Sequence, residues 1–182
     1  PATAQQAKPL LTVADYARFE SILGETLSPD GRWFAYRVTK PDQDGELRIR
    51  RSDGGDSVRV VPLGASPAFS ADSRYLVWSV DLTIAEREKL TREKKPIRLQ
   101  AAVLHLATGT ITRHEDVRAF TLSPDAQYLV LHGYAPTEPR GKGAPLRVVH
   151  LASGTVTAFG DVGEYRWADR GALLAMTVAT GG

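Results

Sequence analysis

The sequence predicts an all-β fold made of tandem four-stranded units, and three observations support this prediction. A short turn motif recurs four times, an apolar run of strand length follows each copy, and a second hairpin motif lies between the copies. Repetition of this kind indicates a repeat architecture, in which neighbouring units stack and bury a core that no single unit can bury alone.

The turn motif begins at residues 27, 69, 122 and 167, so its copies are 42, 53 and 45 residues apart. Its fullest copy is Leu27-Ser28-Pro29-Asp30-Gly31. Proline presets φ for the second position of a turn, aspartate can hydrogen-bond to nearby backbone, and glycine accepts the positive φ that closes a short hairpin. The motif therefore predicts a tight turn between two strands in every unit.

An apolar run follows each turn, at residues 33–38, 75–80, 128–131 and 173–178. The runs are short and rich in β-branched and aromatic residues, which favours strands over helices. Their apolar residues are consecutive rather than alternating, as is typical of a sheet covered on both faces. We therefore expect these large side chains to be largely buried: Trp33, Tyr36, Phe69, Trp78, Phe120, Leu122 and Trp167.

A second hairpin motif separates the turns. Residues 103–109 and 148–154 match almost residue for residue, and residues 47–60 form the same kind of unit. Two hairpins in roughly 45 residues make one blade of a β-propeller, a WD40-like repeat. The prediction is a partial propeller of about three and a half four-stranded antiparallel blades. Its parts are an N-terminal arm at 1–26, blades at 27–68, 69–121 and 122–166, and a partial blade at 167–182.

Two helices interrupt the strands in this prediction. Thr83 with Glu86 three residues later is a capping box, and Pro96 ends the pattern, so a surface helix is expected over 83–95. Near the start, Thr12 is expected to cap a short helix over 13–22. Residues 135–145 are rich in proline and glycine and predict a long loop.

The partial fourth blade leads to a further expectation. It holds a first hairpin and lacks a second, which predicts that the chain is part of a longer protein. An apolar strand without its neighbour would expose an unpaired edge. Remaining blades of the same protein, or self-association of the chain through this open edge, would then cover it.

Composition excludes several classes of function. Hydrophobic residues make up 42% and charged residues 24%, which is typical of a folded globular protein. The net charge of +2, from 23 basic and 21 acidic residues, gives no basic patch for nucleic acid. No apolar run approaches the roughly 20 residues of a membrane span. Cysteine is absent, which excludes disulfides and cysteine-based metal sites.

No catalytic, cofactor-binding or metal-ligating residue is predicted. The histidines invite such a role, but His105 and His150 occupy equivalent repeat positions, which favours a repeated structural environment; the others are His114 and His132. The segment 64–68 is the nearest match to a Gly-x-Ser-x-Gly elbow, and it lacks the last glycine. The turn aspartates, Asp30, Asp72 and Asp125, are expected to be structural. The charged helix at 83–95 is either a solvated surface or a contact to a substrate or partner.

The segments 27–36 (Leu-Ser-Pro-Asp-Gly-Arg-Trp-Phe-Ala-Tyr) and 122–125 (Leu-Ser-Pro-Asp) resemble the propeller repeats shared by TolB-like proteins and the prolyl oligopeptidase family of serine peptidases. Three more features resemble bacterial members of the peptidase family. These are the leader at 11–16, the charged insertion at 83–96, and the Leu-Ala-Thr-Gly and Leu-Ala-Ser-Gly hairpins at Leu106 and Leu151.

The resemblance covers the family's non-catalytic half. It implies an N-terminal propeller that gates the access of short peptides to a C-terminal α/β-hydrolase domain with a Ser, Asp and His triad, none of which lies in these residues. It also implies a peptide substrate and a periplasmic or secreted protein, with the cytoplasm as the alternative. The second interpretation is a TolB-like propeller that binds a protein partner without enzyme activity.

Overall fold

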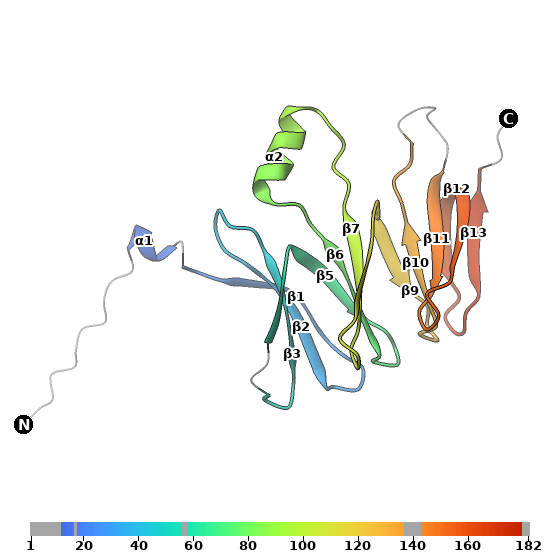
Figure 1. The fold of residues 1–182 in the computed structure, drawn as a ribbon, viewed down its shortest axis with the longest axis horizontal. Coiled ribbons are helices and arrows are strands. Elements are labelled where there is room, and N and C mark those ends of the chain that lie inside the picture. Colours follow the sequence, from blue (N-terminus) through green and yellow to red (C-terminus); the bar gives the residue numbers. More distant parts are fainter. Residues whose placement is uncertain (1–11, 17, 56–57, 137–142, 180–182) are drawn as a thin grey trace, which may run out of the picture.

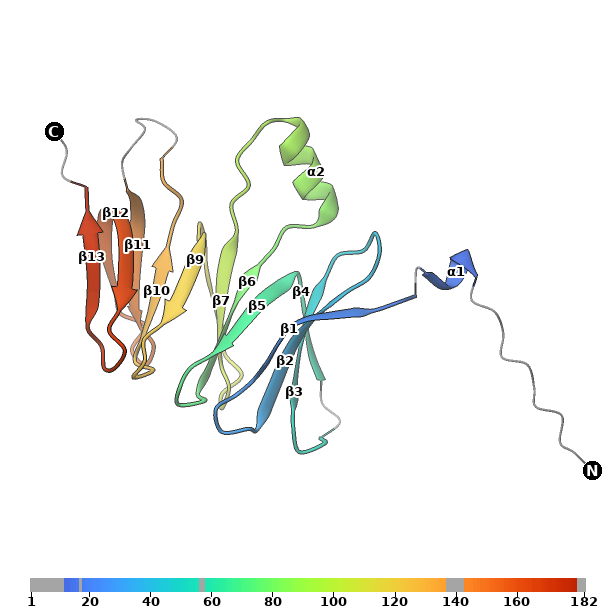
Figure 2. The same cartoon turned by 180° about the vertical axis from the view of Figure 1, so that it is seen from behind.

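The computed structural model describes residues 12–16, 18–55, 58–136 and 143–179. Three antiparallel sheets follow one another along the chain, and Figure 1 shows them side by side with helix α2 above the first two. Figure 2 shows the molecule from behind, where the left-to-right order is reversed and the second sheet again lies between the first and the third. The helices are α1 (Val13–Tyr16) and α2 (Ile84–Arg92).

The sheets have the strand orders β1-β2-β3-β4, β5-β6-β7-β8 and β9-β10-β11-β12-β13. The first sheet is formed by β1 (Ser21–Leu27), β2 (Trp33–Thr39), β3 (Glu46–Arg51) and β4 (Val58–Pro62). The second is formed by β5 (Gly64–Phe69), β6 (Tyr75–Val80), β7 (Gln100–His105) and β8 (Ile111–His114). The third is formed by β9 (Ala119–Leu122), β10 (Tyr128–His132), β11 (Ala144–His150), β12 (Val156–Trp167) and β13 (Leu174–Val178).

Strand β12 serves two neighbouring units. Its first part, 156–162, pairs with β11, and its second part, 162–167, pairs with β13. Asp161 lies where the parts join and has a positive φ of 52°. Leu63 (62°) and Asp116 (55°) have positive φ at the other two connections between units. The second part of β12 and β13 thus form the first hairpin of a further unit. We call it the β12–β13 hairpin, and from here on the third sheet means β9, β10, β11 and the first part of β12.

The sheets begin one strand earlier than the units expected at 27–68, 69–121 and 122–166. The turn motif joins the first strand of a sheet to the second, as in the pairing of β1 with β2. A boundary drawn at the motif therefore separates each first strand from its own sheet.

The helix expected over 13–22 is wrong in extent, because α1 ends at Tyr16. Thr12 does hydrogen-bond to the carboxylate of Asp15, through both its N–H (2.9 Å) and its hydroxyl (2.7 Å). Beyond that, Ile22 pairs with Val38 in β2. Pairing with β2 supplies the backbone hydrogen bonds of this segment, so it is a strand.

Helix α2 confirms the predicted capping box. The Thr83 hydroxyl accepts the Glu86 N–H (3.1 Å), and the Glu86 carboxylate accepts the Thr83 N–H (3.1 Å). The helix ends earlier than residue 95, because Lys94 takes a positive φ of 53°. Such a residue closes the last turn of a helix in the left-handed conformation.

The core consists of three apolar clusters, each of which fills the space between two neighbouring layers. In β6, Leu76 and Trp78 pack towards the first sheet, whereas Tyr75 and Val77 pack towards the third. A further cluster joins the third sheet to the β12–β13 hairpin. Consecutive residues of one strand therefore serve opposite clusters, which confirms the expected coverage of both faces of a sheet.

Of the seven large side chains expected to be largely buried, Trp78 is fully buried, with an exposed fraction of 0%. The remaining six are only partly buried. Trp33, Phe69 and Trp167 lie at strand ends beside the turns, where the adjacent sheet covers less of them. Tyr36 is on the face of the first sheet that points away from the second.

The turn motif is held together by a buried serine hydroxyl. In the second copy, the Ser70 hydroxyl donates to the carboxylate of Asp72 (2.6 Å) and accepts the N–H of Tyr75 (2.9 Å). The same carboxylate oxygen accepts the N–H of Arg74 (3.1 Å). The serine and aspartate thus satisfy the backbone N–H groups that the tight turn leaves without strand partners.

Two other copies repeat this arrangement, in which Ser28 bonds to Asp30 and Ser123 bonds to Asp125, each at 2.6 Å. The Ser28 hydroxyl, and then the N–H of Arg32, hold the pKa of Asp30 below its usual value. The resulting stabilisation is present above the unfolded-state pKa of Asp30 and is lost as the pH falls through its lower folded-state pKa. The aspartates of the turns are therefore structural.

One position of the turn has a positive φ in all four copies: Gly31 (71°), Ser73 (59°), Ala126 (60°) and Gly171 (74°). Only glycine adopts this conformation without steric cost. The small residues at this position keep that cost low, which explains why the motif is recognisable in the sequence.

Replacing Trp78 with alanine is expected to lower the free energy of unfolding by about 3–5 kcal/mol, because the indole fills a closed space between two sheets. Trp78→Phe keeps most of the ring and should cost much less. Urea denaturation followed by circular dichroism measures both. An unchanged denaturation midpoint for Trp78→Ala would show that the indole is not part of the core.

Replacing Ser70 with alanine is expected to cost about 1–3 kcal/mol, because the buried N–H of Tyr75 loses its side-chain acceptor. Ser21→Ala, at an exposed serine of β1, is the control and should change the stability by less than about 0.5 kcal/mol. Thermal denaturation compares the two variants. Equal stability of both variants would contradict the role of the hydroxyl.

Candidate functional site

The repeat-equivalent histidines hold hairpin turns. Nδ1 of His105 accepts the N–H of Thr108 (3.2 Å), and Nδ1 of His150 accepts the N–H of Ser153 (3.3 Å). The His105 ring also packs edge-on against Tyr75, with the centroids 5.0 Å apart. A ring nitrogen that accepts a backbone N–H is not free to bind a metal ion.

His114 is half-buried at the end of β8. Burial, and then the nearby Arg147 guanidinium, lower the pKa of His114 and so favour its neutral form. It shares with His105 a groove of about 460 Å³ between the second and third sheets. Within the described ranges, no three His, Asp or Glu side chains come together in an arrangement that could hold a metal ion.

Ser66, the serine of the nearest elbow-like segment, lies in strand β5. The register of β5 against β6 shifts between Ala65 and Ala68, so Ser66 occupies a bulge and has a positive φ of 51°. A nucleophile elbow instead joins a strand to a helix. The segment is thus part of a sheet and has no elbow geometry.

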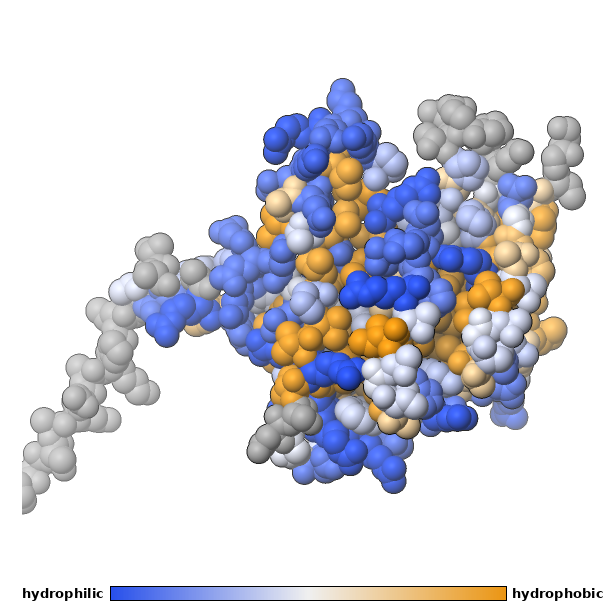
Figure 3. Space-filling view, viewed as in Figure 1, coloured by the Kyte–Doolittle hydropathy of each residue, from blue (hydrophilic) through white to orange (hydrophobic). Residues whose placement is uncertain are grey.

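Helix α2 is anchored at its base and exposed along its length. The carboxylate of Asp81 pairs with Arg37 (3.4 Å) and with Arg87 on the helix. Asp44, from the turn between β2 and β3, accepts the N–H of Ile84 (2.7 Å). None of the helix residues is buried, and Figure 3 shows hydrophilic atoms covering this end of the molecule. Its contact with a substrate or partner stays a prediction.

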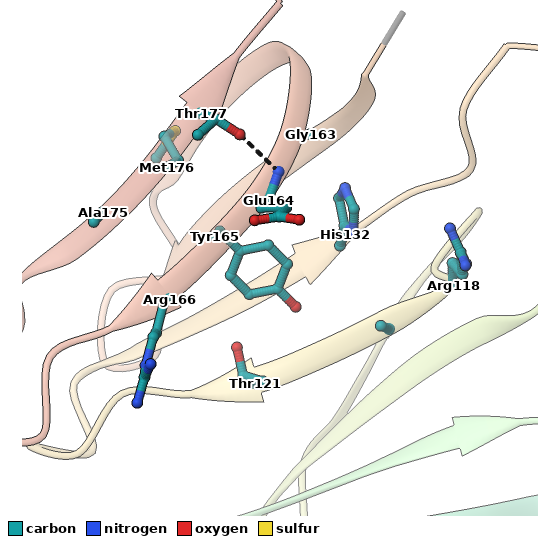
Figure 4. Close-up of a pocket in the computed structure, with 11 residues that line it drawn as sticks. Arg118, Thr121, His132, Gly163, Glu164, Tyr165, Arg166, Ala175, Met176 and Thr177 are labelled. Atoms are coloured by element: carbon teal, nitrogen blue, oxygen red, sulfur yellow. Dashed lines mark hydrogen bonds between the residues drawn. The ribbon is translucent and has the colours of Figure 1, made fainter. Parts of the chain in front are cut away.

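A pocket of about 760 Å³ lies between the third sheet and the β12–β13 hairpin. Figure 4 shows the side chains that surround it. They come from β9 and the residue before it, from the end of β10, and from the hairpin. The lining residues are Arg118, Ala119, Thr121, His132, Gly163, Glu164, Tyr165, Arg166, Ala175, Met176 and Thr177.

The floor of this pocket is partly apolar. The rings of His132 and Tyr165 meet edge to face with their centroids 5.2 Å apart. His132 Nε2 lies 3.4 Å from the carbonyl oxygen of Val162. Tyr165 and Met176 pack against the cluster that joins the hairpin to the third sheet. The floor is therefore fixed by the same packing that holds the hairpin.

Three charged side chains form the rim: Arg118, Glu164 and Arg166. All three are exposed. Among the residues described, none of them has an oppositely charged group within 4.0 Å, unlike Arg37 and Arg48, which form ion pairs. Sequence reasoning did not identify them, because residues 118 and 166 lie far apart in the chain and belong to no shared motif.

Two strand edges border the pocket. β9 is the end strand of its sheet, so its edge away from β10 has no strand partner in the described part of the chain. Residues 165–167 of β12 pair with β13 on one edge, and the other edge has no strand partner among the residues described. Free edges offer N–H and C=O groups to an extended chain.

The described residues contain no helix long and apolar enough to cross a membrane. The chain matches no family model and no curated protein. Comparison with solved structures does give matches, and peptidases are among them, including the β-propeller domain of one.

One match is the β-propeller domain of the Trilobed protease from Pyrococcus furiosus, with a TM-score of 0.57 and 18% identity over 78% of this chain and 43% of that one. An acylaminoacyl peptidase in complex with Z-Gly-Gly-Phe-chloromethyl ketone has a TM-score of 0.55 and 16% identity, over 80% of this chain and 26% of that one. The Pyrococcus horikoshii acylaminoacyl peptidase, in its orthorhombic crystal form, has a TM-score of 0.54 and 13% identity, over 81% of this chain and 26% of that one.

At these identities the similarity shows the fold alone. The chain is all-β, and its sheets are arranged as in part of a β-propeller. It spans less than half the length of each of these three structures.

Proposed function

We propose that this chain is the propeller part of a prolyl-oligopeptidase-like serine peptidase. In this role it gates the access of short peptides to a C-terminal α/β-hydrolase domain of the same protein. The propeller supplies no catalytic group itself. It admits short or flexible peptides to the hydrolase active site and excludes folded proteins by size.

The observation that carries the proposal is the match of the sheets to peptidase propellers. Two features of the chain support it further. The leader that runs directly into the first sheet and the charged insertion α2 both resemble bacterial members of the peptidase family. The anchoring of α2 by Asp81 and Asp44 holds this insertion in a fixed position at one end of the sheets.

The chemistry of the chain is consistent with a non-catalytic role. The serines of the turn motif are buried at 0–2% exposure and bonded to aspartates, and Ser66 lies in a strand bulge. A catalytic serine instead needs a partner base and access to substrate. We also propose a periplasmic or secreted location, which rests on the resemblance to bacterial members of the peptidase family.

The test is the complete product of the gene. We expect its sequence to continue with further blades and then a Gly-x-Ser-x-Gly elbow, followed by Asp and His in that order. A fluorophosphonate probe should label that elbow serine, and its replacement by alanine should abolish both the labelling and the hydrolysis of short peptides. A product with further blades and no hydrolase domain would overturn the proposal and leave the TolB-like binding propeller.

The 182-residue chain by itself is expected to show no labelling by the same probe and no hydrolysis of peptide or ester substrates. The reason is that it lacks an elbow serine with a partner base. Labelling of any serine in this chain, lost when that serine is replaced by alanine, would contradict this expectation.

A further inference from the structure

We propose that the pocket between the third sheet and the β12–β13 hairpin binds an extended peptide segment that carries a carboxylate. This inference deepens the proposed function by naming a class of substrate, and it rests on that function for the meaning of the binding. Three properties of the pocket lead to it: its free strand edges, its partly apolar floor and its unpaired charges.

The strand edges favour a peptide over other ligands. The pocket is lined by residues of β9 and by residues 163–166 of β12, and each of these segments has one edge without a strand partner among the described residues. A backbone N–H or C=O left without a partner gains from pairing with another backbone. An extended chain that enters the pocket can supply these partners by β-strand addition.

The floor accommodates an apolar side chain beside that backbone. Tyr165 and Met176 face the pocket and are held by their packing against the third sheet. The edge of His132 against the Tyr165 ring fixes the ring plane. A rigid floor lowers the conformational entropy that binding must remove. A pocket of about 760 Å³ fits a short segment better than a folded surface.

The charges on the rim favour a negatively charged ligand. Arg118 and Arg166 contribute two positive charges and Glu164 one negative charge, so the rim carries a net charge of +1. Figure 4 shows the two arginine side chains on opposite sides of the Tyr165 ring, with Glu164 at the upper end of the pocket. Guanidinium groups bind carboxylates through charge-assisted hydrogen bonds.

These charges have no structural role in the described residues. Arg118 and Arg166 are exposed and form no ion pair there, whereas Arg37 pairs with Asp81 and Arg48 pairs with Glu20 and Glu46. An unpaired rim charge contributes little to stability and can act on a ligand. The geometry thus assigns both arginines to carboxylate recognition.

The test is equilibrium binding of fluorescein-labelled peptides to the 182-residue chain, measured by fluorescence anisotropy at low salt. Three peptides separate the sources of the carboxylate. They are Ala-Phe-Ala-Glu-Ala amide, its Gln-for-Glu analogue as the amide, and the same Gln analogue with a free C-terminus. We expect at least one carboxylate-bearing peptide to bind about threefold or more tightly than the Gln amide. The peptide that does so identifies a side-chain or a terminal carboxylate.

Variants of the rim give effects of opposite sign. Arg118→Gln and Arg166→Gln should each weaken binding of the acidic peptide about threefold, whereas Glu164→Gln should strengthen it by a similar factor. Arg50→Gln, which removes an exposed positive charge from the first sheet, is the matched control and should leave the affinity unchanged. A rise in salt should reduce the preference for the carboxylate.

Equal affinity for all three peptides, or the absence of binding, would overturn the inference. So would a loss in Arg50→Gln as large as that in the rim variants, because it would indicate attraction by net charge alone. The increase in affinity expected for Glu164→Gln cannot arise from unfolding. The inference therefore stays testable even if an arginine variant is unstable. Labelling of the complete gene product tests the proposed function separately, since it does not depend on this pocket.

Discussion

The second and third sheets of this protein each have two apolar faces and cannot cover either of them alone. Strand β6 shows the constraint most clearly, because Tyr75, Leu76, Val77 and Trp78 are all buried while their side chains alternate between two clusters. A sheet of this kind is stable only between two other layers. The side-by-side order of the sheets follows from this requirement.

The connections between the sheets place the strands that form the pocket. The chain passes from one sheet to the next through a residue of positive φ, at Leu63, Asp116 and Asp161. At the last of these, β12 continues from one unit into the next without a break. The first strand of the next unit then lies beside β9 with one edge free, and the space between the two strands is the pocket. Packing thus fixes the floor of the pocket, whereas its rim consists of exposed charged side chains.

The polar groups that most resemble catalytic residues have structural roles. A serine bonded to an aspartate at 2.6 Å, as in Ser70 and Asp72, would suggest chemistry if it were seen alone. Its burial and its repetition show that it satisfies the backbone of a turn. The same holds for His105 and the hydroxyl-rich hairpin that follows it. In the pocket the situation is reversed, because Arg118 and Arg166 satisfy nothing in the described fold and are free to act on a ligand.

The sequence alone determined what depends on residues close together in the chain. The turn motif closes through hydrogen bonds that span at most five residues, and the capping box of α2 spans three, so both were predictable from local pattern. Only the tertiary structure decided that residues 21–27 form a strand, because that assignment depends on pairing with β2 across the turn. It also decided the pocket, since Arg118 and Arg166 line one space only because β12 continues past the third sheet into the next unit. Contacts between such distant residues are set by how sheets stack, and no local pattern records them.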